Sequence, residues 1–183
     1  MMSDAQYLVA LQKQVQQGKR FKYLCFWGHT AKQSNIVDKS CLSQWFPASF
    51  EVDGHIYKNT EQYMMAQKAK LFDDHEIFSK ILLTGNPKEI KALGRLVKNY
   101  QDDQWKQHRF DIVVKGNLAK FSQNKAMGQF LLNTRDKVLV EASPFDKIWG
   151  IGVAEQDHTA EKPILWQGLN LLGFALMEVR KQL

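Results

Sequence analysis

Apolar residues recur at helical spacing near both ends of the chain. Positions 7, 8, 11 and 15 are apolar and follow Ser3, a residue typical of helix N-caps, so we expect a helix from Ser3 to about Gly18. Positions 169, 172, 176 and 179 fall on one side of a second helix, from Gly168 to Lys181. Each of these helices has one stripe to bury against a core.

The middle of the chain is also predicted to be helical, with capping residues at each start. Thr60 caps a helix from Glu61 to about Phe72, and Asn86 followed by Pro87 opens another. Further helices are expected at 74–83, capped by Asp73 or Asp74, at 102–114, and in shorter stretches up to 132.

Three segments have the pattern of strands. Phe21 to Trp27 is aromatic-rich and ends at a glycine, and 50–52 and 55–57 flank Asp53-Gly54, a dipeptide favoured in two-residue hairpin turns. We expect these pieces to form a small antiparallel sheet. Val138 to Ala142 alternates like a further short strand. The predicted fold class is therefore α+β, a predominantly helical single domain with a small antiparallel sheet.

Composition supports one domain with a real core. The chain has 183 residues, of which 44% are hydrophobic and 24% charged, and only 4 are Pro and 11 Gly, which excludes collagen-like and disordered classes. No apolar run reaches the roughly 18 residues that a membrane span needs. The N-terminus lacks the order of a signal peptide, so we expect a cytoplasmic protein without a membrane partner.

The formal net charge of +6 suits an anionic partner, but the basic residues are spread along the chain without a run or tract. A nucleic acid is thus a possible partner that the sequence does not favour. Two cysteines are too few for a disulfide framework. Neither zinc spacing nor a dinucleotide or phosphate-loop fingerprint is present, so we expect no metal and no cofactor.

Two pairs of ionisable residues are candidates for chemistry. Glu61 and Lys68 lie nearly two helical turns apart beside an apolar stripe, where they could border one pocket or lie on a solvated face. Glu141 lies near the end of the strand at 138–142, and Asp146 follows after a turn. Two such carboxylates could supply a general acid or base and stabilise a developing cation, or Asp146 could simply cap its turn.

Aromatic and basic residues offer further candidates for ligand binding. Phe26, Trp27 and Trp149 could enclose a flat heterocycle, although most buried Trp side chains serve packing. Arg95, Arg109 and Lys120 could clamp a phosphate or carboxylate.

An ordered series of motifs runs through the chain from about residue 21 to its end. Its members are Phe26-Trp27-Gly28-His29, 42–47, 57–69, Gly94-Arg95, Trp105, Arg109, Lys120-Phe121, 131–134, 139–143, Asp146, Trp149-Gly150-Ile151-Gly152, Asn170, Leu172-Gly173, Leu176-Met177 and Val179-Arg180. This series resembles the NADAR family, typified by the YbiA-like N-glycosidases. The resemblance implies a NADAR domain over 21–183, with 1–20 as a helical extension. One position departs from the family, which usually has Asn where Gln44 stands.

The resemblance implies hydrolysis of the N-glycosidic bond between a ribose phosphate and a base. The expected substrates are phosphoribosylated pyrimidine intermediates of riboflavin biosynthesis, cleaved to a base and ribose 5-phosphate. ADP-ribosylated guanine in nucleic acid is the first alternative, and a binding module for ADP-ribose without catalysis is the second. The oligomeric state is left open.

On this reading the candidate residues take specific roles. Glu141 or Asp146 stabilises the ribosyl cation or activates water, and Glu61 positions a ribose hydroxyl or exchanges a proton. Lys68 contacts the phosphate or base, or attacks the opened sugar to form a Schiff base. The candidates for substrate binding are Phe26, Trp27, Trp105 and Trp149 for the base, Gly28 and Gly150 for close backbone approach, and Arg95, Arg109 and Lys120 for the phosphate.

Overall fold

The computed structural model describes residues 3–31, 33 and 36–183. Within that part, the elements in chain order are α1 (Asp4–Gln16), β1 (Tyr23–Phe26), the 3₁₀ helix η1 (Lys39–Leu42), β2 (Phe50–Val52), β3 (His55–Tyr57), α2 (Thr60–Leu71), α3 (His75–Leu83), α4 (Pro87–Arg95), α5 (Asp102–Gln123), α6 (Lys125–Asn133), β4 (Val138–Glu141), the 3₁₀ helix η2 (Pro163–Leu165) and α7 (Leu171–Gln182). Helices predominate and the strands are short, which confirms the α+β class. None of the helices in the described ranges is both long and apolar enough to cross a membrane.

The strands form two separate pairs, which corrects one expectation. The hairpin β2–β3 is antiparallel as predicted, and both turn residues have positive φ, 52° at Asp53 and 78° at Gly54. The strand at Phe21–Trp27 does not join it. Instead β1 pairs in parallel with β4, with Phe26 opposite Glu141. Parallel pairing requires a long crossover, here more than a hundred residues, and that is invisible in the local pattern of either strand.

The core side of β4 is closed by α7. Asn170, whose φ is 56°, precedes α7 and pairs with the strand through its side-chain amide, which accepts from the Glu141 N–H and donates to the Leu139 carbonyl at 2.9 Å each. Gly173 allows the helix to approach closely, because a Cβ there would lie 2.1 Å from the same Leu139 oxygen. These contacts fix the end of β4 at Glu141.

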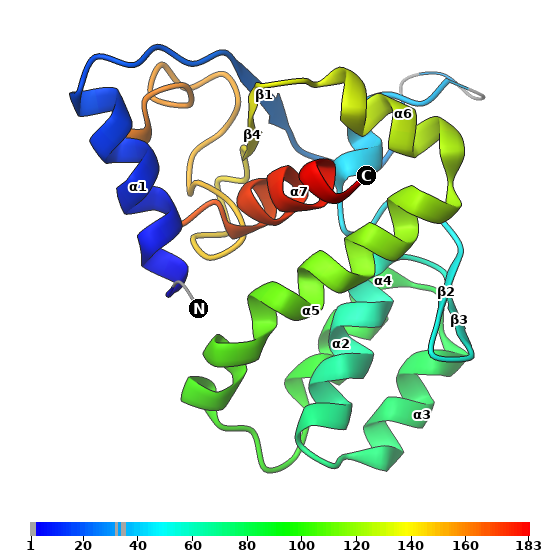
Figure 1. The fold of residues 1–183 in the computed structure, drawn as a ribbon. Coiled ribbons are helices and arrows are strands. Elements are labelled where there is room, and N and C mark those ends of the chain that lie inside the picture. The colour runs from blue at the N-terminus through cyan, green and yellow to red at the C-terminus, as the bar shows by residue number, and fades with distance from the viewer. Residues whose placement is uncertain (1–2, 32, 34–35) are drawn as a thin grey trace.

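Helix α5 runs between α7 and α2 and packs on both of them, so it links the two halves of the molecule (Figure 1). It runs to Gln123, well beyond the predicted end near Val114. Gly116 does not break the helix, because the Tyr63 ring of α2 fills the space beside it, 2.4 Å from where a Cβ would lie. A packed glycine therefore continues a helix that its propensity alone would weaken.

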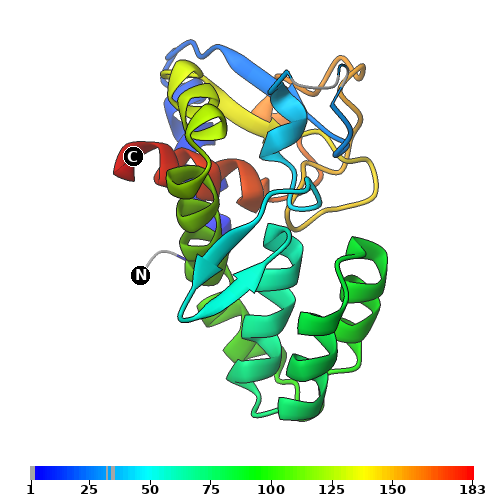
Figure 2. The same cartoon turned by 90° about the vertical axis from the view of Figure 1, so that its right-hand side faces the viewer.

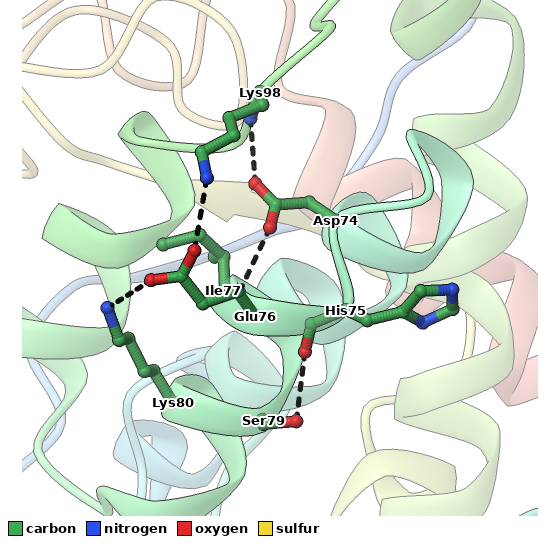
Figure 3. Close-up of polar contacts among 7 residues, drawn as sticks. All are labelled: Asp74, His75, Glu76, Ile77, Ser79, Lys80 and Lys98. Carbon is green, nitrogen blue, oxygen red and sulfur yellow. Dashed lines mark hydrogen bonds and ion pairs between the residues drawn. The ribbon is translucent and has the colours of Figure 1, made fainter.

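Helices α2, α3 and α4 pack together below β1 and β4, and the loop after β4 lies on the same side of the molecule as α4 (Figure 2). The segment after α4 is tied to the start of α3 (Figure 3). Asp74 accepts from the backbone N–H groups of Ile77, at 3.1 Å, and of Lys98, at 2.9 Å, and Glu76 pairs with the side chains of Lys80 and Lys98. The Asp74 bonds hold the position of α4, while the exposed ion pairs add little.

The N-terminal helix α1 packs on the rest of the domain instead of projecting from it. Tyr7 stacks on Phe110 with ring centroids 4.3 Å apart, and Asp4 forms a buried ion pair with Arg109. Cys25 and Cys41 are free and buried, as the cysteine count suggested.

Candidate active site

A cavity of about 850 Å³ opens where the strands meet helices α2 and α4. This volume lies in the upper part of the range typical of small-molecule sites. One side is formed by the ends of β1 and β4 and the loop after β4, and the other by residues 43–45, α2 and α4. Because β1 and β4 are parallel, their last residues, Phe26 and Glu141, lie at the same edge, and the chain after each strand turns into the cavity.

Nine of the thirteen predicted site residues line this cavity: Glu61, Lys68, Glu141, Asp146, Phe26, Trp27, Gly28, Arg95 and Trp149. They come from four separate segments of the chain, so their convergence is a property of the fold. Because Glu61 and Lys68 both line the cavity, the alternative that they lie on a solvated face is excluded.

Glu61 lies in the first turn of α2 and is 4% exposed. The pKa of its carboxyl is raised to about 7, chiefly by burial; attraction by Lys91 and a hydrogen bond from the Trp45 side chain oppose the rise, and repulsion from Asp146 adds a smaller contribution to it. Its backbone N–H donates to the Gln44 carbonyl at 3.0 Å, which fixes the start of the helix against that segment.

Glu141 is the last residue of β4, and its Oε2 is buried without a hydrogen-bond partner in the described structure. Burial raises the pKa of this carboxyl to about 8, helped by the nearby charges of Asp146 and Glu61. A buried polar atom without a partner is costly, and in a cavity wall it is the atom best placed to bind a ligand.

Asp146 is oriented by the turn that follows β4. Its Oδ1 accepts from the backbone N–H groups of Ile148 and Trp149, each at 2.8 Å, so the turn-capping role foreseen for it is real. The same residue lines the cavity and interacts electrostatically with Glu61 and Glu141. Capping and catalysis are therefore compatible, because one oxygen holds the turn.

Three of the basic residues that line the cavity come from α2 and α4. Lys68 donates to the Gly94 carbonyl at 2.8 Å and lies over the Tyr100 ring, 4.2 Å from its centroid, and burial lowers its pKa. Lys91 and Arg95 are exposed and lie one turn apart on α4. Carboxylates and cations thus share one cavity.

Aromatic side chains surround the opening. Trp27 and Phe145 are 54% and 86% exposed, and their ring centroids lie 6.3 Å apart. Trp45 packs near His29, with ring centroids 5.5 Å apart. Exposed aromatic rings at a cavity mouth are suited to contact with a flat ligand.

Four predicted residues are not brought to the cavity wall. Arg109 is 5% exposed and occupied by Asp4, to which its Nε donates at 2.7 Å. Lys120 is fully buried and donates to two backbone carbonyls. The ring centroid of Trp105 lies 5.8 Å from the Lys68 Nζ, and Gly150 is buried where a Cβ would lie 2.9 Å from the Asp146 and Glu141 carbonyl oxygens. Trp105 and Gly150 therefore lie next to residues that line the cavity without lining it themselves.

Sequence reasoning missed Lys91 and Phe145 as lining residues and did not single out Trp45 among the aromatics. Lys91 could have been predicted from the sequence, because it lies one helical turn before Arg95 and so shares the same face of the helix. Phe145 was not, since nothing in a loop sequence shows where a side chain points. Within the described ranges, no group of three His, Cys, Asp or Glu residues is arranged to hold a metal ion.

Comparison with known proteins gives concordant matches. The model of the NADAR domain family matches residues 25–183. An N-glycosidase from Acanthamoeba polyphaga mimivirus is 44% identical over 166 residues, covering 88% of this chain and 96% of that protein. A riboflavin biosynthesis protein from Vibrio vulnificus is 32% identical over 142 residues, 78% of this chain but 35% of that protein. The NMR structure of the Escherichia coli protein YbiA has a TM-score of 0.71 at 25% identity and covers 90% of this chain and 86% of that chain.

Proposed function

The chain belongs to the NADAR family of N-glycosidases, and from that premise we propose that it hydrolyses a small phosphorylated ribosyl compound of a nitrogen base. The products are the free base and ribose 5-phosphate. The observation that carries the proposal is the convergence of three carboxylates and several basic side chains in one cavity: Glu61, Glu141, Asp146, Lys68, Lys91 and Arg95.

The carboxylates meet the two electrostatic demands of the reaction. Breaking a ribosyl C–N bond leaves positive charge on the sugar and requires a proton on the departing base. Because burial, helped by repulsion from nearby carboxylates, raises the pKa values of Glu61 and Glu141 to about 7 and about 8, the pair retains a proton near neutral pH. The protonated member donates to the base, and the ionised member with Asp146 stabilises the sugar cation.

Lys68 supplies the nucleophile in this proposal. Burial lowers the pKa of its amine, which favours loss of the proton, and Lys68 lines the cavity. The sugar ring opens to an iminium that still carries the base at C1, and the Lys68 nitrogen adds to that carbon. The bond from C1 to the base nitrogen then breaks as the carboxyl pair transfers the proton released by the lysine nitrogen to the base, and water hydrolyses the resulting Schiff base to ribose 5-phosphate and the free amine. The alternative is a simpler role in which Lys68 contacts the phosphate. Reduction with borohydride during turnover distinguishes the two roles, because it traps only a Schiff base.

Lys91 and Arg95 bind the phosphate. Both line the cavity on the exposed face of α4, where an anionic group can enter from solvent. An Arg guanidinium binds phosphate through two parallel N–H bonds, and a Lys one turn away adds a second charge. This role passes to Lys91 because Arg109 and Lys120 are occupied elsewhere.

The base is proposed to be the aminopyrimidine of an early riboflavin intermediate. Support comes from the related riboflavin biosynthesis protein and from the aromatic opening formed by Trp27, Phe145 and Trp149. A flat base stacks on such rings, and its polar edge reaches the carboxylates behind them.

The test is a direct comparison of two substrates. Purified protein is incubated with the phosphoribosylaminopyrimidine or with an oligonucleotide carrying ADP-ribosylated guanine, and released base is measured by chromatography. We expect cleavage of the first. Cleavage of the oligonucleotide alone would transfer the assignment to nucleic-acid repair, and cleavage of neither would favour a binding module.

A matched pair of variants tests the phosphate contact within the same assay. Arg95→Ala should raise KM by about ten-fold or more, the scale of a lost charge-assisted bond. Lys88→Ala, which removes an exposed cation of the same helix that does not line the cavity, should leave KM unchanged. Equal effects of the two substitutions would contradict the assignment.

A further inference from the structure

Lys120 is a fully buried lysine of α5 that the proposed reaction does not use. Its Nζ donates to the carbonyl oxygens of Cys41, at 2.6 Å, and Ser43, at 3.0 Å. These carbonyls end the 3₁₀ helix η1, where a cation satisfies groups that have no partner in the helix itself. Burial lowers the pKa of Lys120 to about 7, which shows that the position is costly for a charge.

The segment that Lys120 holds is the cavity wall formed by Ser43, Gln44 and Trp45. The Gln44 carbonyl accepts from the Glu61 N–H at 3.0 Å. The Gln44 side chain accepts from Asn117, one turn before Lys120 on the same helix, at 2.8 Å. Two side chains of α5 therefore fix the segment against the start of α2.

Ser43 connects the lysine to the catalytic carboxylate. Its carbonyl accepts from Lys120, while its hydroxyl accepts from the backbone N–H of Trp45 at 3.2 Å. The Trp45 side chain in turn donates a hydrogen bond to the Glu61 carboxylate and opposes the rise of its pKa. A displacement of Ser43 would move the indole that holds Glu61.

We propose that Lys120 is a positioning residue for Glu61, acting through Ser43 and Trp45. A methionine could fill a similar apolar space between Phe46 and Phe121 without the cost of burying an amine, so the amine is retained for the two carbonyls it holds. The inference rests on the proposed function only for the importance of Glu61, because the linkage itself exists in the free protein.

The experiment measures the pKa of Glu61 in the protein without substrate, by NMR titration of its side-chain carboxyl carbon, and kcat separately. The variants are Lys120→Met, Trp45→Phe and the double variant. Lys120→Arg serves as the conservative variant, because it keeps the hydrogen-bond donors and the positive charge. Ile81→Val, in the buried core of α3 away from the cavity, controls for lost stability.

We expect Trp45→Phe and Lys120→Met each to raise the pKa of Glu61 and to lower kcat by about ten-fold, the scale of one hydrogen bond. The double variant should change the pKa and kcat no more than either single variant, since both substitutions remove the same contact between Trp45 and Glu61. Lys120→Arg should retain the native pKa, and Ile81→Val should change stability alone. If Lys120→Met does not fold, Lys120→Gln replaces it.

A folded Lys120→Met or Lys120→Gln with the native pKa of Glu61 would overturn the proposal, as would additive effects in the double variant. Coupled pKa changes in a protein that cleaves neither substrate would contradict the proposed function while leaving the positioning role supported. The two failures are thus distinguishable.

Discussion

Replacing Glu61 by Gln should stabilise the protein at alkaline pH while it removes activity. The pKa of this carboxyl is raised from 4.5 to about 7 in the folded protein, chiefly by burial. Between these values the folded state holds a proton that the unfolded state has lost, so the free energy of unfolding falls as pH rises. Above about pH 7 the full cost is present, and below about pH 4.5 it is absent.

The magnitude follows from the change in pKa. At about 1.4 kcal/mol for each pKa unit, the ionised carboxyl costs the folded state about 3 kcal/mol at pH 8.5. Gln has nearly the same shape, can still accept from Trp45, and carries no charge. For a chain of this size 1 kcal/mol corresponds to about 2–4 °C, so Glu61→Gln should raise Tm by up to about 10 °C at pH 8.5.

The assay is thermal unfolding followed by circular dichroism from pH 4.5 to 8.5, with turnover measured in parallel. The Tm difference between variant and wild type should grow with pH and vanish near pH 4.5, and turnover should fall by at least ~100-fold. Glu51→Gln, at an exposed position on β2, should leave Tm unchanged. A Tm gain independent of pH, or none at pH 8.5, would refute the reasoning.

Three further predictions concern other parts of the site. Phe145→Ala should raise KM without changing Tm, because the ring is 86% exposed and adds little to the core; a lowered Tm with native KM would assign it to packing. Gly173→Ala should lower the free energy of unfolding by about 1–3 kcal/mol in urea titrations, since its Cβ would lie 2.1 Å from the Leu139 oxygen, and native stability would show that α7 can shift. Borohydride added during turnover should trap an adduct on Lys68, found by mass spectrometry; an active enzyme that yields none would exclude the covalent route.

The helices and the hairpin were predictable because their signals are local. Asn86 and Pro87 mark the start of α4, and Asp53-Gly54 has the positive φ angles that its turn requires. The end of α5 was not, because Gly116 looks like a weak point until the Tyr63 ring packs beside it. Local propensity was overridden there by a contact with a residue more than fifty positions away.

The chemical character of the site could be predicted from the sequence, but the set of residues that line it could be predicted only in part. Acidic and aromatic residues were identified by type and order along the chain, and the fold brings most of them together. Arg109 and Lys120 have the charge of phosphate ligands, but each is buried against a partner from a distant segment. Charge is visible in a sequence, whereas burial beside a particular carboxylate or carbonyl depends on tertiary structure.

The parallel pairing of β1 with β4 explains why the cavity exists where it does. In a parallel pair both strands end at the same edge, so Phe26 and Glu141 lie opposite each other and the chain diverges beyond them. The loop after β4 then carries Asp146 toward the start of α2, where Glu61 lies. An antiparallel pairing would place Phe26 and Glu141 at opposite ends of the strands and leave Glu61 without its acidic neighbours. The crossover that no local pattern revealed thus brings Asp146 close to Glu61 and Glu141, where its charge adds to the rise in their pKa values that burial chiefly causes.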